Sequence, residues 1–305
     1  MTDLPATTAT TADSARWPAA APSGALAGRH VLFIGGGNMA SAMISGLLES
    51  GLPAAQLAVI EPLAAARASL AQKRGVTTFP DASGVDESRE YCAIVLAVKP
   101  QQAGAALKGC QGLLRRHPAT VLISIAAGLD VKLLSAMSGG HRRIARAMPN
   151  TPSLIGAGIS GLFTPHDSPA ADQEIAYAIL ASTGKVVRVD HEHLIDTVTA
   201  VSGSGPAYAF YLMEAMIEAG ITGGLDAAAA RELALHTVRG AALLALASEE
   251  PPEVLRARVT SPAGTTAAAV AVLDQRQVKA GICEAIRAAA ARSRELSAEA
   301  RKSQP

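Results

Sequence analysis

Short apolar runs alternate with longer segments of helical periodicity along most of the chain. Runs of strand length predict β-strands at 30–34, 56–60, 76–79, 92–98, 120–126, 143–147, 158–163 and 185–189. Helical spacing of apolar residues predicts helices at 38–50, 62–74, from 100 to about 116, and from 130 onwards. Continuously apolar strands that alternate with helices are typical of βαβ units, in which helices cover both faces of a mostly parallel sheet.

The pattern changes after about residue 190, where the strand signals end. Long helical segments follow at 207–219, 226–247, 265–273 and 276–300. We therefore predict an α/β fold class, with a mostly parallel, doubly wound sheet at 29–190 and an all-α domain at 191–305. Residues 1–28 are rich in Ala, Thr, Ser and Pro, lack a secretory signal, and are predicted to be a disordered tail.

The composition argues against several classes of protein. Hydrophobic residues make up 49% of the chain and charged residues 17%, which argues against wholesale disorder. The formal net charge of +1 and the 3% aromatic content argue against a nucleic-acid partner. No uncharged apolar run reaches the about 18 residues that span a bilayer, so no membrane partner is predicted.

The cysteines and histidines indicate no metal site. Cys92, Cys110 and Cys283 are too few and too scattered for a disulfide framework or a thiolate site, and the histidines show no convincing metal spacing. This cysteine usage favours a reducing, cytoplasmic location.

A glycine-rich segment directly after the first predicted strand fits the pattern G-x-G-x-x-A. Gly35 permits a tight turn, Gly37 lets a pyrophosphate approach the backbone, and Ala40 lets the following helix pack close to the strand. Asn38 and Met39 open that helix, whose free N–H groups and partial positive charge favour a phosphate. The alternative is a simple glycine-rich turn, but the strand–turn–helix context favours a Rossmann-like dinucleotide-binding domain at 29–190.

An acidic residue at the end of the second strand bears on the choice of cofactor. Glu61 lies 24 residues after Gly37, where a carboxylate can accept hydrogen bonds from ribose hydroxyls and repels a 2′-phosphate. It therefore favours NADH over NADPH. Two alternatives stay open: Glu61 caps the helix that begins at Pro62, or Arg67 turns back and binds a 2′-phosphate.

The fourth long strand ends in Ala97, Lys99 and Pro100, beside the first strand at the expected crevice mouth. From this position Lys99 can reach the cofactor, although a lysine at an exposed strand end is the simpler interpretation. Two loops of small residues, at 201–206 and 260–266, precede predicted helices, where free N–H groups suit a small carboxylate.

Six segments resemble one family, the pyrroline-5-carboxylate reductases. They are IGGGNMASAM (34–43), VLAVKPQ (95–101), SIAAG (124–128), RAMPNTP (146–152), DTVTAVSGSGPAY (196–208) and VTSPAGTT (259–266). Their order and intervals also resemble those of the family, from about His30 to Leu296. The last two segments are far more specific than the dinucleotide loop, which many oxidoreductases share.

The resemblance implies a Rossmann-like domain followed by a helical dimerisation domain, which forms a homodimer or a ring of dimers. It implies hydride transfer from NADPH or NADH to the C=N bond of 1-pyrroline-5-carboxylate, giving L-proline. It places Met148 and Asn150 at the nicotinamide end of the cofactor.

The resemblance also implies a set of substrate-binding residues in the helical domain. The substrate carboxylate would lie at Ser261, Gly264 and Thr265, and Thr266 would act as the catalytic residue near the ring nitrogen. Glu249 matches a glutamate near the substrate amine, although a solvent-exposed acid at a helix end explains it equally well.

Two other functions compete with this one. Hydroxyacid and glycerol-phosphate dehydrogenases also pair a Rossmann domain with helices, but they place a catalytic lysine there, and residues 207–247 contain no lysine. A nucleotide-binding protein without activity would be favoured if the 260–266 loop were degraded, and this loop is intact.

Overall fold

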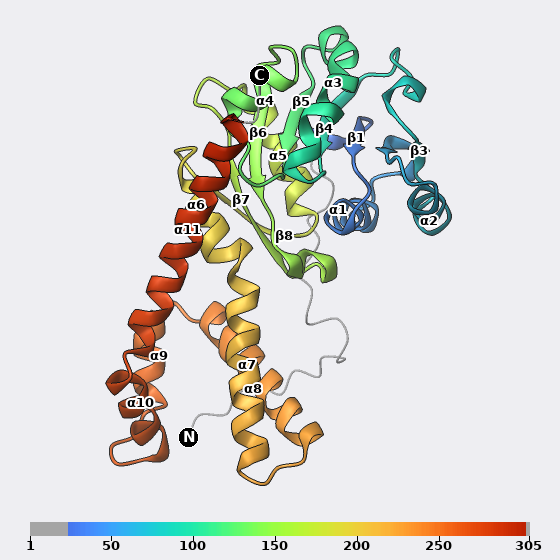
Figure 1. Cartoon of the computed structure of the whole chain (residues 1–305). Coiled ribbons are helices and arrows are strands. Elements are labelled where there is room, and N and C mark those ends of the chain that lie inside the picture. The colour runs from blue at the N-terminus through green and yellow to red at the C-terminus, as the bar shows by residue number, and fades with distance from the viewer. Residues whose placement is uncertain (1–23, 303–305) are drawn as a thin grey trace. The chain divides into compact units, whose positions relative to one another are not determined.

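The computed structural model describes residues 24–302, and Figure 1 shows the course of the chain. Two compact units make up the described chain. The first contains the residues up to Gly203 together with those from Ala290 onwards, and the second is Ser204–Ala289. Each unit is described below by itself.

An eight-stranded sheet forms the centre of the first unit, with the strand order β3-β2-β1-β4-β5-β6-β7-β8. Its strands are β1 His30–Ile34, β2 Leu57–Ile60, β3 Thr77–Phe79, β4 Tyr91–Leu96, β5 Val121–Ser124, β6 Ile144–Met148, β7 Gly158–Phe163 and β8 Gly184–Arg188. All neighbouring strands are parallel except β6 and β7. The predicted mostly parallel sheet is therefore confirmed.

Helices cover both faces of this sheet. The main helices of the unit are α1 Asn38–Glu49, α2 Ala64–Arg74, α3 Pro100–Arg116, α4 Val131–Met137, α5 Ala170–Ala181 and α6 Leu194–Val198. The shorter turns are η1 Gly24–Leu26, η2 Ala54–Gln56, η3 Ala82–Gly84, η4 Thr151–Ile155 and the π-helical turn η5 Thr199–Gly203.

The two faces of the sheet form two separate hydrophobic cores, because side chains alternate along a strand. Val31 and Phe33 of β1 point into the core that α1 and α5 cover, whereas Leu32 and Ile34 point into the core that α3 and α4 cover. The doubly wound arrangement is thereby confirmed.

The predicted tail at 1–28 needs one correction. Residues 1–23 lie outside the described residues, but η1 packs against α5, and Leu26 is only 1% exposed within the first core. The prediction of disorder is therefore wrong for 24–28, because a single leucine there completes the core beside α5.

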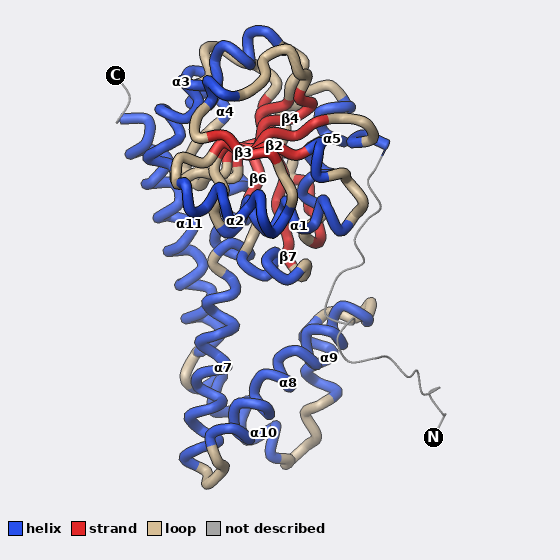
Figure 2. Tube along the Cα trace, turned by 90° about the vertical axis from the view of Figure 1, so that its right-hand side faces the viewer, coloured by secondary structure: helices blue, strands red, loops and turns tan. Residues whose placement is uncertain are grey.

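The second unit contains only helices and loops (Figure 2). Its helices are α7 Gly205–Thr222, α8 Ala227–Ala247, α9 Pro252–Arg258, α10 Thr265–Gln275 and the first part of α11 Val278–Lys302. The all-α domain was predicted from residue 191. In the structure α6 packs against β6 and β7, so the first unit continues to Gly203.

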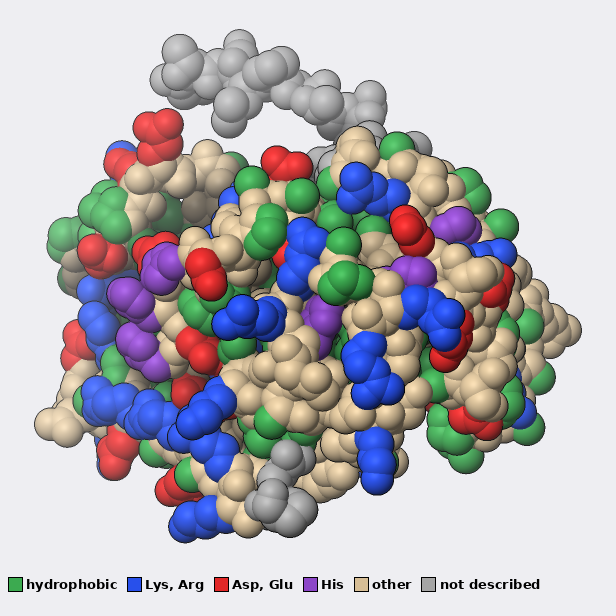
Figure 3. Space-filling view, turned by 90° about the horizontal axis from the view of Figure 1, so that it is seen from above, with side chains coloured by type: hydrophobic (Ala, Val, Ile, Leu, Met, Phe, Trp, Pro, Cys, Tyr) green, Lys and Arg blue, Asp and Glu red, His purple; other side chains and the backbone are tan. Residues whose placement is uncertain are grey.

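The surface carries both signs of charge. Figure 3 shows Lys and Arg side chains interspersed with Asp and Glu across one face, in line with the formal net charge of +1. None of the helices within 24–302 is both long and apolar enough to cross a membrane.

Candidate dinucleotide and substrate site

The carboxyl ends of the parallel strands bring the predicted cofactor residues together in the first unit. The order of the sheet reverses between β1 and β4, and open α/β sheets bind ligands in the crevice outside such a switch point. The residues predicted to bind the cofactor lie at the carboxyl ends of β1, β2, β4 and β6, in the loops that follow these strands or in the first residues of the next helix.

Gly35 fits its position only as glycine. It has a φ of +95°, and a Cβ atom there would lie 2.7 Å from the backbone oxygen of Ala97. Its N–H donates to the Ile60 oxygen at 2.8 Å. Gly35 therefore lets the ends of β1, β2 and β4 meet closely, which is the tight turn predicted from the sequence.

The space in front of Gly37 is open. Gly37 is exposed, and a Cβ atom there would meet nothing within 4 Å. Helix α1 begins directly after it, and no side chain caps the helix start. Asn38 and Met39 thus present free backbone N–H groups, while Ala40 is buried against the core. An open approach to uncapped N–H groups fits the pyrophosphate of a dinucleotide.

Glu61 fastens the glycine loop to the second strand. Its carboxylate accepts from Gly36 N–H at 2.9 Å and from Leu63 N–H at 2.9 Å, and the residue is 8% exposed. A carboxylate has about four acceptor positions, so two remain for ribose hydroxyls. Helix α2 begins at Ala64 and not at Pro62, and the Glu61 carboxylate bonds the N-cap residue Leu63 and not a residue of the first helical turn, so the predicted capping of the helix is not confirmed.

Arg67 is held near the same turn. Its Nη1 donates to the backbone oxygens of Glu61 and Pro62, each at 2.8 Å. The guanidinium therefore lies beside the Glu61 backbone, and its other N–H groups are left for a ligand.

The loop after β4 lies at the same carboxyl edge of the sheet. Ala97 N–H donates to the Ile34 oxygen at 2.8 Å and keeps this loop beside the end of β1. Lys99 is exposed at the N-cap of α3, its side chain makes no capping bond, and Pro100 opens the helix. The structure leaves the Lys99 ammonium free to turn towards the crevice or towards solvent.

Met148 is the last residue of β6, and Asn150 lies in the loop that follows it. Met148 is half-buried, and Asn150 is 8% exposed. The Asn150 amide bonds to two other segments of the first unit, β7 and η5. Nothing in the motif alone signalled those two bonds.

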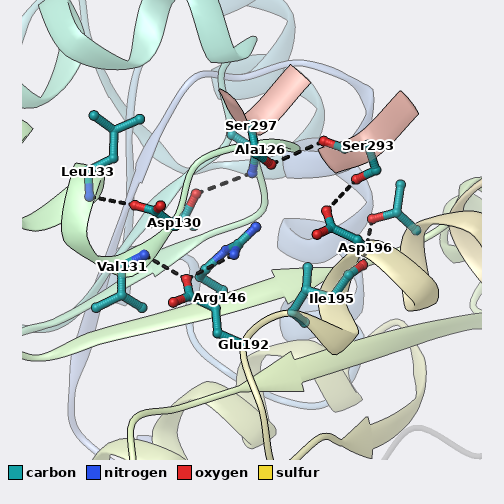
Figure 4. Close-up of polar contacts among 12 residues, drawn as sticks. Ala126, Asp130, Val131, Leu133, Arg146, Glu192, Ile195, Asp196, Ser293 and Ser297 are labelled. Atoms are coloured by element: carbon teal, nitrogen blue, oxygen red, sulfur yellow. Dashed lines mark hydrogen bonds and ion pairs between the residues drawn. The ribbon is translucent and has the colours of Figure 1, made fainter. Parts of the chain in front are cut away.

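Two groups of polar contacts link distant segments of the first unit (Figure 4). Arg146 of β6 and Glu192 form an ion pair at 2.9 Å, and the same carboxylate accepts from Val131 N–H at 2.7 Å. Ser293 of α11 donates to Asp196 at 2.6 Å. Sequence analysis missed these residues, because charged side chains far apart in a sequence give no sign of being paired.

In the second unit, the predicted substrate loop leads into helix α10. Gly264 is the N-cap of α10, which no side chain caps, and Gly264 N–H donates to the Ser261 oxygen at 3.1 Å. Ala263 has a φ of +58°, a left-handed conformation that is uncommon for alanine and is often found at functional sites. Thr265 and Thr266 begin α10, with Thr266 half-buried. The loop thus gathers hydroxyls and free N–H groups within one unit.

Glu249 lies just after the end of α8 and is exposed. Its neighbour Glu250 forms an ion pair with Arg258 at 2.5 Å. Glu250 is therefore paired within its own segment, whereas the Glu249 carboxylate is exposed. Within the described part of the chain, no group of three or more His, Cys, Asp or Glu side chains is arranged to hold a metal ion.

This arrangement is typical of one class, the α/β proteins that bind a dinucleotide at the switch point of their sheet. Residues 30–128 match the family model described as NADP oxidoreductase coenzyme F420-dependent. Residues 192–296 match the model described as pyrroline-5-carboxylate reductase dimerisation.

Relatives extend this likeness over most of the chain. A pyrroline-5-carboxylate reductase of Pseudomonas aeruginosa is 42% identical over 267 residues, which cover 88% of this chain and 96% of the relative. The corresponding Pasteurella multocida protein is 41% identical over 275 residues, covering 88% and 98%.

Solved structures agree. A pyrroline-5-carboxylate reductase of Coxiella burnetii superposes with a TM-score of 0.82 at 36% identity, covering 88% of this chain and 98% of that one. The Plasmodium falciparum pyrroline carboxylate reductase with NADP bound superposes with a TM-score of 0.76 at 28% identity, with the same coverage. The chain belongs to the pyrroline-5-carboxylate reductase family, and the resemblance found in the six segments is confirmed.

Proposed function

We propose that this protein reduces the C=N bond of 1-pyrroline-5-carboxylate and releases L-proline. The observation that carries the proposal is the loop at 260–266 that leads into the uncapped start of α10, in a chain that belongs to this family. The reduced nicotinamide cofactor supplies the hydride when bound.

The first unit would hold the cofactor. The N–H groups of Asn38 and Met39 would bind the pyrophosphate, with Gly35 and Gly37 allowing its approach. Glu61 would accept from the adenosine ribose. The loop of Ala97, Lys99 and Pro100 would border the middle of the cofactor, and Met148 and Asn150 would border its nicotinamide end.

The loop before α10 would bind the substrate. Ser261 and Thr265 would donate to the substrate carboxylate, because hydroxyls and free N–H groups at a helix start favour an anion. Gly264, whose own N–H donates to the Ser261 oxygen, would line this site with its backbone. Thr266 would donate near the ring nitrogen as the catalytic residue. Glu249 would lie near the substrate amine and favour its positive charge.

For this reaction the protein mainly has to position the imine against the cofactor. A protonated imine is already electrophilic, so holding it in an attack geometry supplies most of the acceleration. The protein has to orient the carboxylate and keep a proton on the ring nitrogen. Neither task requires a nucleophile or a charge-relay triad.

Glu61 leads us to propose NADH as the better cofactor, because its buried carboxylate repels a 2′-phosphate. Arg67 opposes this preference from the same turn. E61S should therefore improve kcat/KM for NADPH relative to NADH, by about 10-fold, since one charge contact is removed at short range. A variant whose cofactor ratio equals that of the natural chain would contradict the proposed role of Glu61.

We further propose that the protein works in the cytoplasm as a homodimer or as a ring of dimers. The match to a dimerisation domain supports this, as do exposed apolar side chains of the second unit, among them Tyr211, Leu246 and Val259. Light scattering of the purified protein should give at least twice the 31.0 kDa chain mass.

The substrate site is tested by Thr266. T266A should lower kcat/KM for the imine by about 100-fold, because a hydrogen bond made mainly in the transition state is lost. The affinity for NADH should stay the same. T266S keeps the hydroxyl and should recover most of the activity; an unchanged kcat/KM in T266A would contradict the assignment.

A further inference from the structure

Asn150 bridges two elements of the first unit with its side chain. The Oδ1 atom accepts from the N–H of Ile159 on β7 at 3.0 Å, and Nδ2 donates to the backbone oxygen of Ser202 in η5 at 3.2 Å. The residue is 8% exposed. Both ends of the amide are therefore engaged within the chain.

The bridged turn η5 is unusual. It is π-helical, a form that is rare and frequently marks functional sites. Thr199 Oγ1 donates to the Ile195 oxygen at 2.8 Å, and Ser202 Oγ donates to the Val198 oxygen at 3.0 Å. These two hydrogen bonds connect η5 to α6, whereas the Asn150 side chain connects η5 to the sheet.

Two glycines allow these elements to pack closely. A Cβ atom on Gly161 of β7 would lie 2.5 Å from Val198 Cγ1, so α6 rests directly on the strand. A Cβ atom on Gly203 would lie 3.0 Å from Met148 Cε. The end of η5 thus packs against Met148, the side chain placed above at the nicotinamide end.

We propose that Asn150 is a positioning residue: its bond to the Ser202 oxygen holds η5 against Met148 and so maintains the nicotinamide end of the site. This inference rests on the proposed function for its effect on turnover. The residue type follows from the two partners, because Ile159 N–H requires an acceptor and the Ser202 oxygen requires a donor. An amide supplies both, whereas a carboxylate of the same shape supplies acceptors only.

The test uses N150D, which keeps the acceptor and loses the donor. We expect kcat/KM for 1-pyrroline-5-carboxylate to fall about 10-fold or more, as small misplacements at a reacting centre do. The affinity for ADP, a probe of the glycine-loop end alone, should stay within about 2-fold. Hydrogen exchange of the amides at 199–203 should become faster, because η5 loses its anchor to the sheet.

The matched control is S153A. Ser153 lies in the same loop and is 3% exposed, and its Oγ has no hydrogen-bond partner among the described residues. All three measurements should be unchanged in S153A.

Unchanged exchange at 199–203 in N150D would overturn the proposal, and a loss of activity on that background would point to direct contact with the cofactor. If N150D does not fold, N150S is measured in the same way. If the natural chain fails to reduce the imine, the proposed function fails, while the exchange and ADP measurements still decide the role of Asn150.

Discussion

Gly35 and Gly37 lie in the same loop, but they differ in whether a side chain would fit there. A Cβ atom at Gly35 would collide with the Ala97 oxygen on a backbone of positive φ, whereas a Cβ atom at Gly37 would meet open space. G35A should therefore lower the free energy of unfolding by about 3 kcal/mol. G37A should lower it by only about 0.5 kcal/mol but weaken NADH binding about 10-fold, since the methyl group stands where the pyrophosphate approaches.

Urea denaturation and NADH titration measure these two effects separately. A G37A variant that binds NADH normally would remove Gly37 from the proposed cofactor site. The sequence pattern already predicted both roles, because each follows from the order of residues around a single turn.

Two histidines, one of them buried, make stability depend on pH. Burial lowers the pKa of His141, and burial together with Arg89 lowers the pKa of His30. Below the ordinary histidine pKa of about 6.5, the unfolded chain binds protons that the folded chain does not, so stability falls as the pH is lowered. The His141 Nε2 bonds to the Thr120 oxygen at 2.8 Å, a contact that the glutamine of H141Q can replace.

H141Q should therefore lose less stability than the natural chain between pH 7 and pH 5 in urea denaturation. Equal losses in the two proteins would show that His141 does not titrate as its burial requires.

At the scale of elements, one ion pair joins the segment before β6 to the first turn of α5. Arg143 Nε and Nη2 donate to the Asp172 carboxylate at 2.8 and 2.6 Å, and the side chains are 27% and 3% exposed. R143M leaves a buried carboxylate without a partner and should cost about 3 kcal/mol. D172N leaves a guanidinium that still reaches water and should cost about 1 kcal/mol.

Urea denaturation of R143M and D172N at the same protein concentration measures both free energies of unfolding and checks that R143M loses more stability. Equal costs would mean that the Asp172 carboxylate is hydrated despite its burial.

The strands were the most predictable elements. A continuously apolar segment of strand length, such as 92–98, indicates a strand that is buried on both faces of a sheet. Strand β4 Tyr91–Leu96 lies where that pattern predicted it. Helix α5 was missed, although its residues pack on the first core. Its apolar positions are mostly alanine, which contrasts weakly with the polar ones.

Contacts between distant segments were the least predictable part. The Asn150 bridge to Ser202 and the Arg146–Glu192 pair depend on how β6 and the loop after it meet η5 and the segment before α6 in space. A motif can name Asn150 as a candidate, but only the folded chain shows that both ends of its amide are already bonded.

At the scale of the whole molecule, the proposed function divides cofactor binding and substrate binding between the two units. The first unit has a doubly wound sheet whose strand order reverses between β1 and β4, and the second unit carries the 260–266 loop in an all-helical setting. Many oxidoreductases share the first arrangement, so the fold alone leaves the substrate open. The substrate assignment comes from the second unit and from the family to which the chain belongs.

The central claim is tested most directly by adding 1-pyrroline-5-carboxylate to the purified protein with NADH, and separately with NADPH, and following nucleotide absorbance and proline. We predict that nucleotide is consumed in a one-to-one ratio with the L-proline formed, and faster with NADH. Binding of both nucleotides without consumption of either would contradict the account and favour a nucleotide-binding protein without this activity.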